Sequence, residues 1–335
     1  MTITPPDRRP TIRDVAAAAG VSKSLVSLVY AAPESVSAAR RQRVFDAADA
    51  LGYRRPNQAA RSLAAAHGGL IAILVADLHN PVLFDLVDAA RSAFAESGQV
   101  ALVTAASLPQ ADGHPRLDRP GLELFGDLRP SALLVIGSVP EVARLAHIAP
   151  GRPIALASTI APELTDAWTV RGDDWSGIHL LVRHLVELGH RDIAHVGGAG
   201  GAIAALRADA YRAAMGAAGL GAHIRVGSCD FSEPGGHNAT AELLRNSTPP
   251  TAVIAINDLA AVGAMAAAAD ARTRLAVTGY DGTYLAALRQ IDLTTIDPNN
   301  VEIGRTAARL LMHPDGMREV LVPPKLVIRG STTRP

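Results

Sequence analysis

The sequence predicts an α/β protein with an N-terminal three-helix head and two doubly wound subdomains, each built on a parallel sheet. The length of 335 residues exceeds what one ordinary core accommodates. Residues 10–52 show short helices separated by turn signals, and apolar runs alternate with amphipathic helices from Leu70 onward. The composition is that of a globular protein, with 48% hydrophobic and 19% charged residues, so we expect two or three packing units.

The first helix is predicted over residues 12–19. Thr11 and Asp14 form an [ST]xx[DE] pair whose side chains can satisfy free backbone groups at a helix start. The glycine that follows the helix can adopt the positive φ that ends it. Ser22 can then cap a second helix over residues 23–30, so a helix-turn-helix unit is expected.

A third helix is predicted over residues 38–51, with Ser37 as its cap and three arginines near its first turn. Beyond it, residues 58–66 form an Ala-rich segment with helical potential, followed by a flexible glycine pair. Residues 1–66 hold ten Lys and Arg against five Asp and Glu, and the rest of the chain holds 22 against 27. A positive head on an acidic body is expected if only the head approaches phosphate, although a solvated basic surface gives the same count.

The remaining 265 or so residues carry the pattern of two parallel sheets covered by helices. Any ligand is expected between the strand ends of the two subdomains. The predicted strands are 70–76, 100–105, 132–136, 154–157, 192–196, 252–256 and 275–278. The predicted helices include 81–96, 175–188, 207–218 and 259–269.

A helix-turn-helix unit in a basic segment places its second helix in the DNA major groove, with its first residues facing base edges. Ser22, Lys23, Ser24 and Ser27 are the candidate contacts. The structural alternative is a plain three-helix bundle in which Ser22 only caps a helix. Leu63, on a short polar segment, can wedge into a minor-groove base step; alternatively, it packs on the following domain.

The chain resembles the lactose-repressor and galactose-repressor family of bacterial transcription regulators over almost its whole length. Its motifs keep the family's order and nearly its spacing. In the head they are Thr11-Ile12-Arg13-Asp14-Val15-Ala16, Ala19-Gly20-Val21-Ser22-Lys23, Val36-Ser37, Leu51-Gly52-Tyr53, Pro56-Asn57 and Ala60-Arg61-Ser62-Leu63. Further along they include Asp77-Leu78-His79-Asn80-Pro81, Leu188-Gly189-His190, Arg207 with Tyr211, Asn257-Asp258 and Gly279-Tyr280-Asp281.

The resemblance implies a homodimer or a dimer of dimers, a palindromic double-stranded DNA operator, a hinge helix that folds on DNA and an effector cleft between subdomains of periplasmic-binding-protein type. It predicts a head over residues 1–55, a hinge over 56–67 and an effector-binding and dimerisation domain over 68–335. The latter divides into 68–158 with 297–322, and 159–296 with 323–335. The DNA-binding residues are then Thr11, Ser22, Lys23, Ser24, Ser27, Ser37, Asn57, Ala60, Arg61 and Leu63.

Asn80, Arg207, Asp258 and Asp281 map by this resemblance onto effector-cleft positions. Asp carboxylates accept hydrogen bonds from hydroxyls and an Arg fork donates to oxygens, so these residue types suit a sugar or polyol. Each also has a structural interpretation, because Asn257 and Asp258 can cap the next helix and Arg207 can pair on the surface.

The chain departs from the family pattern at several positions. Leu25, Leu28 and Ala31 stand where the family usually has Thr, Arg and Asn, so the operator sequence cannot be carried over. An extra residue at Arg54-Arg55 precedes the hinge. In the cleft, Ser158, Gly282 and Pro298 replace acidic, acidic and Gln residues, which implies a different ligand or none.

Other function classes have little support in the sequence. The glycine-rich turn at 197–201 lacks the third glycine of a dinucleotide fingerprint, and no GxxxxGK[ST], HExxH, GxSxG or paired CxxC motif occurs. We therefore expect no enzyme activity, no cofactor and no metal. Cys229 is expected in the core, and the absence of a signal or membrane segment favours the cytoplasm. The rival hypothesis is a ligand-binding protein or sugar-processing enzyme whose N-terminal helices serve only dimerisation.

Overall fold

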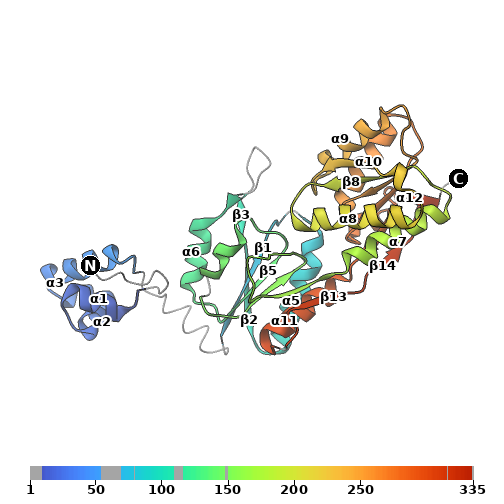
Figure 1. Ribbon diagram of the computed structural model, residues 1–335. Helices are drawn as coiled ribbons and strands as arrows, with labels where there is room; N and C mark the ends of the chain where they lie inside the picture. Colours follow the sequence, from blue (N-terminus) through green and yellow to red (C-terminus); the bar gives the residue numbers. More distant parts are fainter. Residues whose placement is uncertain are drawn as a thin grey trace. The chain divides into compact units, whose positions relative to one another are not determined.

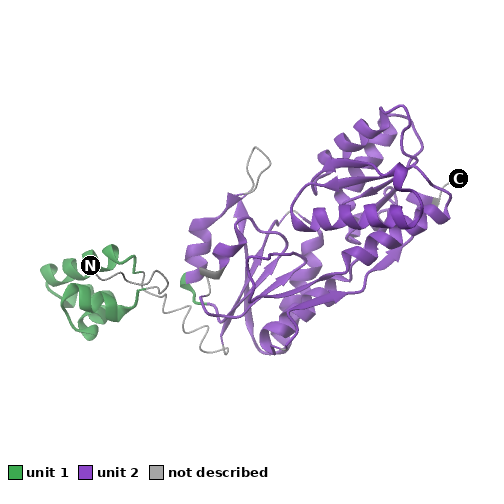
Figure 2. Ribbon diagram, viewed as in Figure 1, with its two compact units in different colours: residues 1–65, 127–129 green, residues 66–126, 130–335 purple. Residues whose placement is uncertain are grey.

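The computed structural model describes residues 10–53, 69–78, 80–108, 116–147, 150–314 and 316–333. The chain forms two compact units, residues 1–65 with 127–129 and residues 66–126 with 130–335 (Figure 2). The predicted hinge contacts Asn57, Ala60, Arg61 and Leu63 lie outside the described residues. In the described part, no single helix is long and apolar enough to cross a membrane. Only α1 (Ile12–Ala19) and α2 (Lys23–Ala31), bent by 104° relative to each other, reach that length and composition together.

The head consists of α1 (Ile12–Ala19), α2 (Lys23–Ala31), the 3-10 turn η1 (Pro33–Ser35) and α3 (Ala38–Ala50). Gly20 ends α1 with a φ of 64°, as the sequence predicts. Buried valines from all three helices form the head's own core, closed by Tyr53 after α3; they are Val15, Val26, Val29 and Val44. The three helix predictions are therefore confirmed to within one residue at each end.

The first sheet of the larger unit has the strand order β13-β7-β6-β5-β1-β2, and its strand pairs are parallel. Figure 1 labels β1, β2, β5 and β13 of this sheet. Its strands are β1 (Leu70–Val75), β2 (Val100–Ala105), β5 (Ala132–Ile136), β6 (Ile154–Ala157), β7 (Trp168–Gly172) and β13 (Glu319–Val322). Helices α5 (Val82–Glu96), α6 (Arg119–Asp127) and α11 (Asn300–Met312) contribute apolar residues to its core. The core strands β1 and β5 are buried along their whole length, as central parallel strands usually are. A short antiparallel pair, β3 (Ser107–Leu108) with β4 (Arg116–Leu117), lies outside this sheet.

The second sheet has the order β14-β12-β11-β10-β8-β9, parallel except for the antiparallel edge strand β14. Its strands are β8 (Ile193–Gly198), β9 (Val226–Cys229), β10 (Ala252–Ala255), β11 (Ala276–Tyr280), β12 (Thr294–Asp297) and β14 (Lys325–Val327). Its helices are α7 (Asp174–Glu187), α8 (Ala202–Ala217), α9 (Glu233–Leu244), α10 (Asp258–Asp270) and α12 (Gly330–Thr333). One apolar cluster joins the sheet to α7 and α8, and another joins it to α9 and α10. The prediction of two doubly wound sheets is confirmed.

The chain passes between the two sheets three times, after β7, after β12 and after β13. The first passage corrects the predicted subdomain boundary at 158/159. Strand β7 follows that boundary yet pairs with β6, aligning Ala157 with Val170, so the chain leaves the first sheet only after Gly172. The five residues of β7 mix apolar and polar side chains, so they lack the continuous apolar run by which the other strands were predicted.

Candidate functional site

Four of the predicted DNA-contact residues, Ser22, Lys23, Ser24 and Ser27, lie at the start of helix α2 or within its first turns. The Ser22 hydroxyl accepts a hydrogen bond from the Leu25 backbone N–H at 3.2 Å and so caps the helix. Ser22, Lys23 and Ser24 are exposed, and Ser27 is half-buried. Capping and DNA contact are thus both compatible with Ser22, because its exposed position leaves the hydroxyl accessible.

Thr11 and Ser37 occupy the other two helix starts of the head. The backbone N–H and the hydroxyl of Thr11 both donate to Asp14 Oδ2, each at 2.6 Å. The Asp14 carboxylate thus satisfies the Thr11 backbone group, as the predicted capping pair requires. Ser37 is exposed at the start of α3, but its hydroxyl makes no capping hydrogen bond, so the predicted side-chain cap is absent there. Instead, Arg41 Nη1 donates to Pro33 O at 3.0 Å and ties α3 to η1.

The three apolar departures in α2 have different environments. Leu25 is half-buried and packs against the head's core. Leu28 is 41% exposed, and Ala31 is exposed at the end of the helix. Leu25 is therefore a packing residue, whereas Leu28 belongs to the solvent-facing side of α2.

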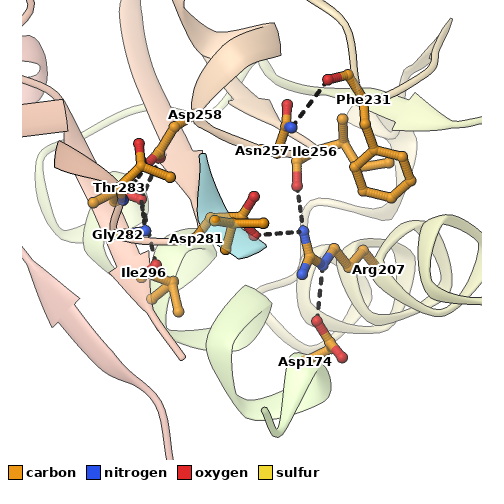
Figure 3. Close-up of polar contacts among 12 residues, drawn as sticks. Asp174, Arg207, Phe231, Ile256, Asn257, Asp258, Asp281, Gly282, Thr283 and Ile296 are labelled. Atoms are coloured by element: carbon orange, nitrogen blue, oxygen red, sulfur yellow. Dashed lines mark hydrogen bonds and ion pairs between the residues drawn. The ribbon is translucent and has the colours of Figure 1, made fainter. Parts of the chain in front are cut away.

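Arg207 is the centre of a buried polar cluster in the second sheet's half of the molecule (Figure 3). Its Nε donates to Asp174 Oδ1 at 2.8 Å, and its Nη1 donates to Ile256 O at 2.5 Å. The same Nη1 lies 3.6 Å from Asp281 Oδ1. The guanidinium also lies over the ring of Tyr280, 3.6 Å from its centroid. The surface-pairing interpretation of Arg207 is therefore wrong: its side chain is only 8% exposed.

The cluster gathers at one edge of the second sheet, because its members follow neighbouring strands. Ile256 comes directly after β10 and Asp281 directly after β11, while Asp174 begins α7. The carboxyl edge of a parallel sheet is where ligands of doubly wound proteins bind. The structure thus brings two of the predicted effector residues, Arg207 and Asp281, into contact at such an edge.

Burial and charge oppose each other in this cluster. For Arg207, burial alone would lower the pKa, but the carboxylates of Asp174 and Asp281 more than compensate and raise it, so the guanidinium is charged. Burial raises the pKa of Asp281 to about 8, against the opposing effect of Arg207, with further raising by Asp258 and Asp174. Near neutral pH, the carboxyl group of Asp281 can therefore donate as well as accept a hydrogen bond.

Asp281 also has an unusual backbone conformation, with a φ of 110°. A non-glycine residue in this region is strained and persists only where its surroundings fix it. The Asp281 N–H donates to Ile296 O at 2.9 Å, and Asn300 Nδ2 donates to Asp281 O at 3.0 Å. Strain of this kind concentrates at functional sites, so it singles out Asp281 among the predicted effector residues.

Asp258 is fully buried and has structural partners. Its Oδ2 accepts from the backbone N–H and hydroxyl of Thr283 at 2.7 and 2.8 Å, and its Oδ1 accepts from the Thr295 hydroxyl at 2.6 Å. Burial raises its pKa to about 6, although these three hydrogen bonds lower it. Asn257 caps α10, its Oδ1 accepting from Ala260 N at 2.8 Å. Asp258 thus anchors the loop that carries Asp281.

Asn80, the fourth predicted effector residue, belongs to the first sheet's half. Its Oδ1 accepts from Val82 N at 3.2 Å at the start of α5. Among the described residues, no hydrogen bond or ion pair joins it to Arg207 or Asp281. The structure therefore brings Arg207 and Asp281 into direct contact, whereas the polar contact described for Asn80 is with the start of α5.

One of the cleft departures has a steric reason. Gly282 has a φ of 64°, and a Cβ there would lie 2.9 Å from the Asp297 Cα, so the acidic side chain common in the family does not fit. Pro298 follows β12 and packs against Gly172, the last residue of β7, so the contact joins two of the passages between the sheets. Ser158, just after β6, also has a positive φ of 53°.

Asp174 and Tyr280 were not identified as site residues from the sequence. Asp174 follows β7, a strand that the sequence analysis missed, so its position at a sheet edge was hidden. Tyr280 belonged to a quoted motif, but its contact with Arg207 depends on packing between α8 and β11. The signal that could have found Asp174 is its place in an acidic pair at the start of an amphipathic helix.

Outside this cluster, the larger unit has a cavity of about 580 Å³ beside α7 and α8, bordered by Pro323 and Pro324. None of the four predicted effector residues lines it. Cys229 is buried in an apolar cluster, as predicted, and burial raises its pKa to about 12. In the described ranges, no group of three or more His, Cys, Asp or Glu residues gathers in a way that could hold a metal ion.

Two family models match the chain. The model for "Bacterial regulatory proteins, lacI family" matches residues 11–57, and the one for "Periplasmic binding protein-like domain" matches residues 182–332. The maltose regulon regulatory protein MalI of Escherichia coli (strain K12) is 31% identical over 310 residues, covering 90% of this chain and 89% of that protein. The first model falls on the head, which argues against N-terminal helices that serve only dimerisation.

Solved structures agree with these matches. The lac repressor dimer bound to operator and the anti-inducer ONPF has a TM-score of 0.68 and 25% identity, covering 97% of this chain and 99% of that one. The regulator CelR in complex with cellobiose has a TM-score of 0.67 and 25% identity, covering 96% and 100%. The chain belongs to the lacI family of bacterial regulatory proteins, and it is a DNA-binding transcription regulator.

Proposed function

We propose that the chain is a homodimeric repressor that binds a palindromic DNA operator through two heads, with its affinity set by a small polar effector. The basic head and the strained, buried Asp281 beside Arg207 support the two halves of this proposal. The solved lac repressor is a dimer on its operator, and CelR binds cellobiose. Because the target is chromosomal DNA, we place the protein in the cytoplasm.

The DNA contacts proposed in the head are Thr11, Ser22, Lys23, Ser24, Ser27 and Ser37. Helix α2 would lie in the major groove, while helix starts and hydroxyls approach phosphates. Asn57, Ala60, Arg61 and Leu63, in the hinge, are proposed to contact the minor groove. We assign residues 1–55 to the head, 56–67 to the hinge and 68–335 to effector binding and dimerisation.

The effector class proposed is a sugar or related polyol, bound at the Arg207–Asp281 edge of the second sheet. A hydroxyl can donate to Asp281 when its carboxyl group is ionised and accept from it when it is protonated. Arg207 would orient ligand oxygens, and Asn80 would contribute from the first sheet's half. Asp258 would act indirectly, by holding the loop that carries Asp281.

Effector binding and DNA binding would be linked through one conformational equilibrium. A ligand that contacts both halves of the larger unit favours the arrangement in which its contacts are best. The three passages between the sheets are where such a change would be accommodated. This arrangement would decide whether the two hinge segments can dock side by side on DNA, so effector and operator would influence each other reciprocally.

The test begins with purified full-length protein and fragments of the source genome. Selection of bound fragments should recover an inverted repeat, and its affinity should fall steeply with salt because two heads release counterions from phosphate. Deletion of residues 1–66 should abolish this binding but leave dimerisation and sugar binding intact. Retention of the repeat by the truncated protein would contradict the assignment of the head.

The effector half needs a separate readout. Mono- and disaccharides and polyols would be screened for a change in affinity for the selected repeat, with Arg212→Met as a control on the exposed face of α8. A compound that changes operator affinity should lose this effect in Asp281→Asn and keep it in Arg212→Met. An unchanged effect in Asp281→Asn would place the effector site elsewhere.

A further inference from the structure

Helix α2 has two distinct sides. Val26 and Val29 are buried in the head's core, and Leu25 and Tyr30 pack beside them. The opposite side, at the 3-, 4- and 7-residue spacing of one helix face, carries Ser24, Ser27, Leu28 and Ala31. This is the side that a recognition helix turns towards base edges.

Leu28 is the largest side chain on that face. On that face it stands among two serines and an alanine, whose short side chains allow the helix to approach a groove closely. Leu25, three residues earlier, borders this face but is half-buried and packs against the head's core. Leu28 is 41% exposed, so burial in the head does not account for a leucine at this position. The face also lacks the Arg, Asn and Gln side chains that make bidentate hydrogen bonds to bases.

The chemistry of the major groove offers one apolar partner to such a residue. Thymine alone among the four bases presents a methyl group there, whereas the other edges present donors and acceptors. Serine hydroxyls accept and donate to several bases and discriminate little between them. An apolar side chain among hydroxyls can therefore distinguish thymine from the other bases.

We propose that Leu28 recognises the 5-methyl group of thymine in each operator half-site, so that an apolar contact sets specificity at that base pair. The inference rests on the proposed DNA-binding function and specifies how the head selects its operator. It predicts that the thymine methyl group, rather than a hydrogen bond, carries the preference.

An isolated exposed leucine is common on protein surfaces and needs no function. The head supplies a matched control in Leu51, which is 38% exposed at the end of α3 and is not part of α2. Leu51→Ala removes the same atoms from a similarly exposed site. A comparison of Leu28→Ala with Leu51→Ala therefore separates a specific contact from a general effect of removing surface apolar area.

The experiment uses the full chain and an operator selected from random DNA. Each thymine of the selected sequence is replaced in turn by deoxyuridine, symmetrically in both half-sites, which removes only the methyl group. At one position this replacement should lower the wild-type operator affinity by roughly 15-fold. Loss of one buried methyl group corresponds to about fourfold in affinity, and the replacement removes one methyl group from each of the two half-sites. The same replacement should lower the operator affinity of Leu28→Ala by less than about twofold, whereas the affinity of Leu51→Ala should fall as much as that of the wild type.

Circular dichroism and melting temperature should be unchanged in both variants, because both leucines are exposed, and Leu28→Met should keep part of the sensitivity. Equal affinity of the wild-type protein for thymine and deoxyuridine at every position would overturn the inference while leaving the proposed function intact. Undiminished sensitivity in Leu28→Ala would also overturn it. If no sequence were selected at all, the proposed DNA recognition and this inference would fall together.

Discussion

Gly172 and Pro298 lie against each other at two of the three passages between the sheets, with the Cβ position of Gly172 only 2.8 Å from the Pro298 Cβ. Real Cβ atoms do not approach so closely, so any side chain at residue 172 would push these two segments apart. The contact therefore couples the segment after β7 to the segment after β12. Both segments join the two halves of the larger unit.

Gly172→Ala should destabilise the larger unit by about 1–3 kcal/mol, because the added methyl group meets a rigid proline ring. Gly216→Ala is the control: Gly216 lies within α8, has no atom within 4 Å of its Cβ position and should gain about 0.5–1 kcal/mol. Urea unfolding of both variants measures the difference. Equal stability of Gly172→Ala and the wild type would mean that the two segments separate freely.

Arg207→Met should lower the free energy of unfolding by about 3–5 kcal/mol at pH 8, because Asp281 would remain buried without its cation and Asp174 would keep only Arg171, at 3.4 Å. The loss should be smaller at pH 5.5, where Asp281, whose pKa is raised to about 8, is mostly neutral. Arg212→Met, on the exposed face of the same helix, should change stability by less than about 0.5 kcal/mol. A stability loss no larger than that of Arg212→Met would contradict the charge-based explanation.

Asp258→Asn should reduce the pH dependence of stability. Burial raises the folded-state pKa of Asp258 to about 6, above its usual value of 3.8, so the folded protein binds a proton that the unfolded chain has released. This contribution is fully present below about pH 4 and is lost as the pH rises through 6. Unfolding by urea between pH 4.5 and 8 should show a shallower decline in Asp258→Asn. The variant lacks the Asp258 titration, and it also lacks the Asp258 charge that raises the pKa of Asp281, so both effects act in the same direction. Parallel declines would show that the carboxyl group is not the cause.

Leu63→Ala should weaken specific operator binding by about 1–3 kcal/mol if this hinge residue enters a minor-groove base step. Leu63 lies outside the described residues, so this prediction depends on the sequence alone. The salt dependence of binding should stay the same, because no phosphate contact is removed. Fluorescence anisotropy on the selected repeat measures both quantities, and an unchanged affinity would remove Leu63 from the mechanism.

The sequence by itself determined the elements whose signals are local. The helices of the head follow from Thr11, Ser22 and Gly20, because capping and left-handed turns depend on residues within one helical turn. Central strands such as β1 and β5 follow from continuous apolar runs. Family motifs then placed Arg207 and Asp281 among four predicted effector residues.

Only the tertiary structure decided where the chain changes sheets and how Arg207 is neutralised. The five residues of β7 carry no apolar run. They join the sheet through backbone hydrogen bonds to β6, the strand before them in the sequence. Asp174 and Asp281 are 107 residues apart in the sequence, yet both contact Arg207. Local sequence patterns carry no information on such contacts, because they arise when separate sheet edges and helix starts pack around one buried charge.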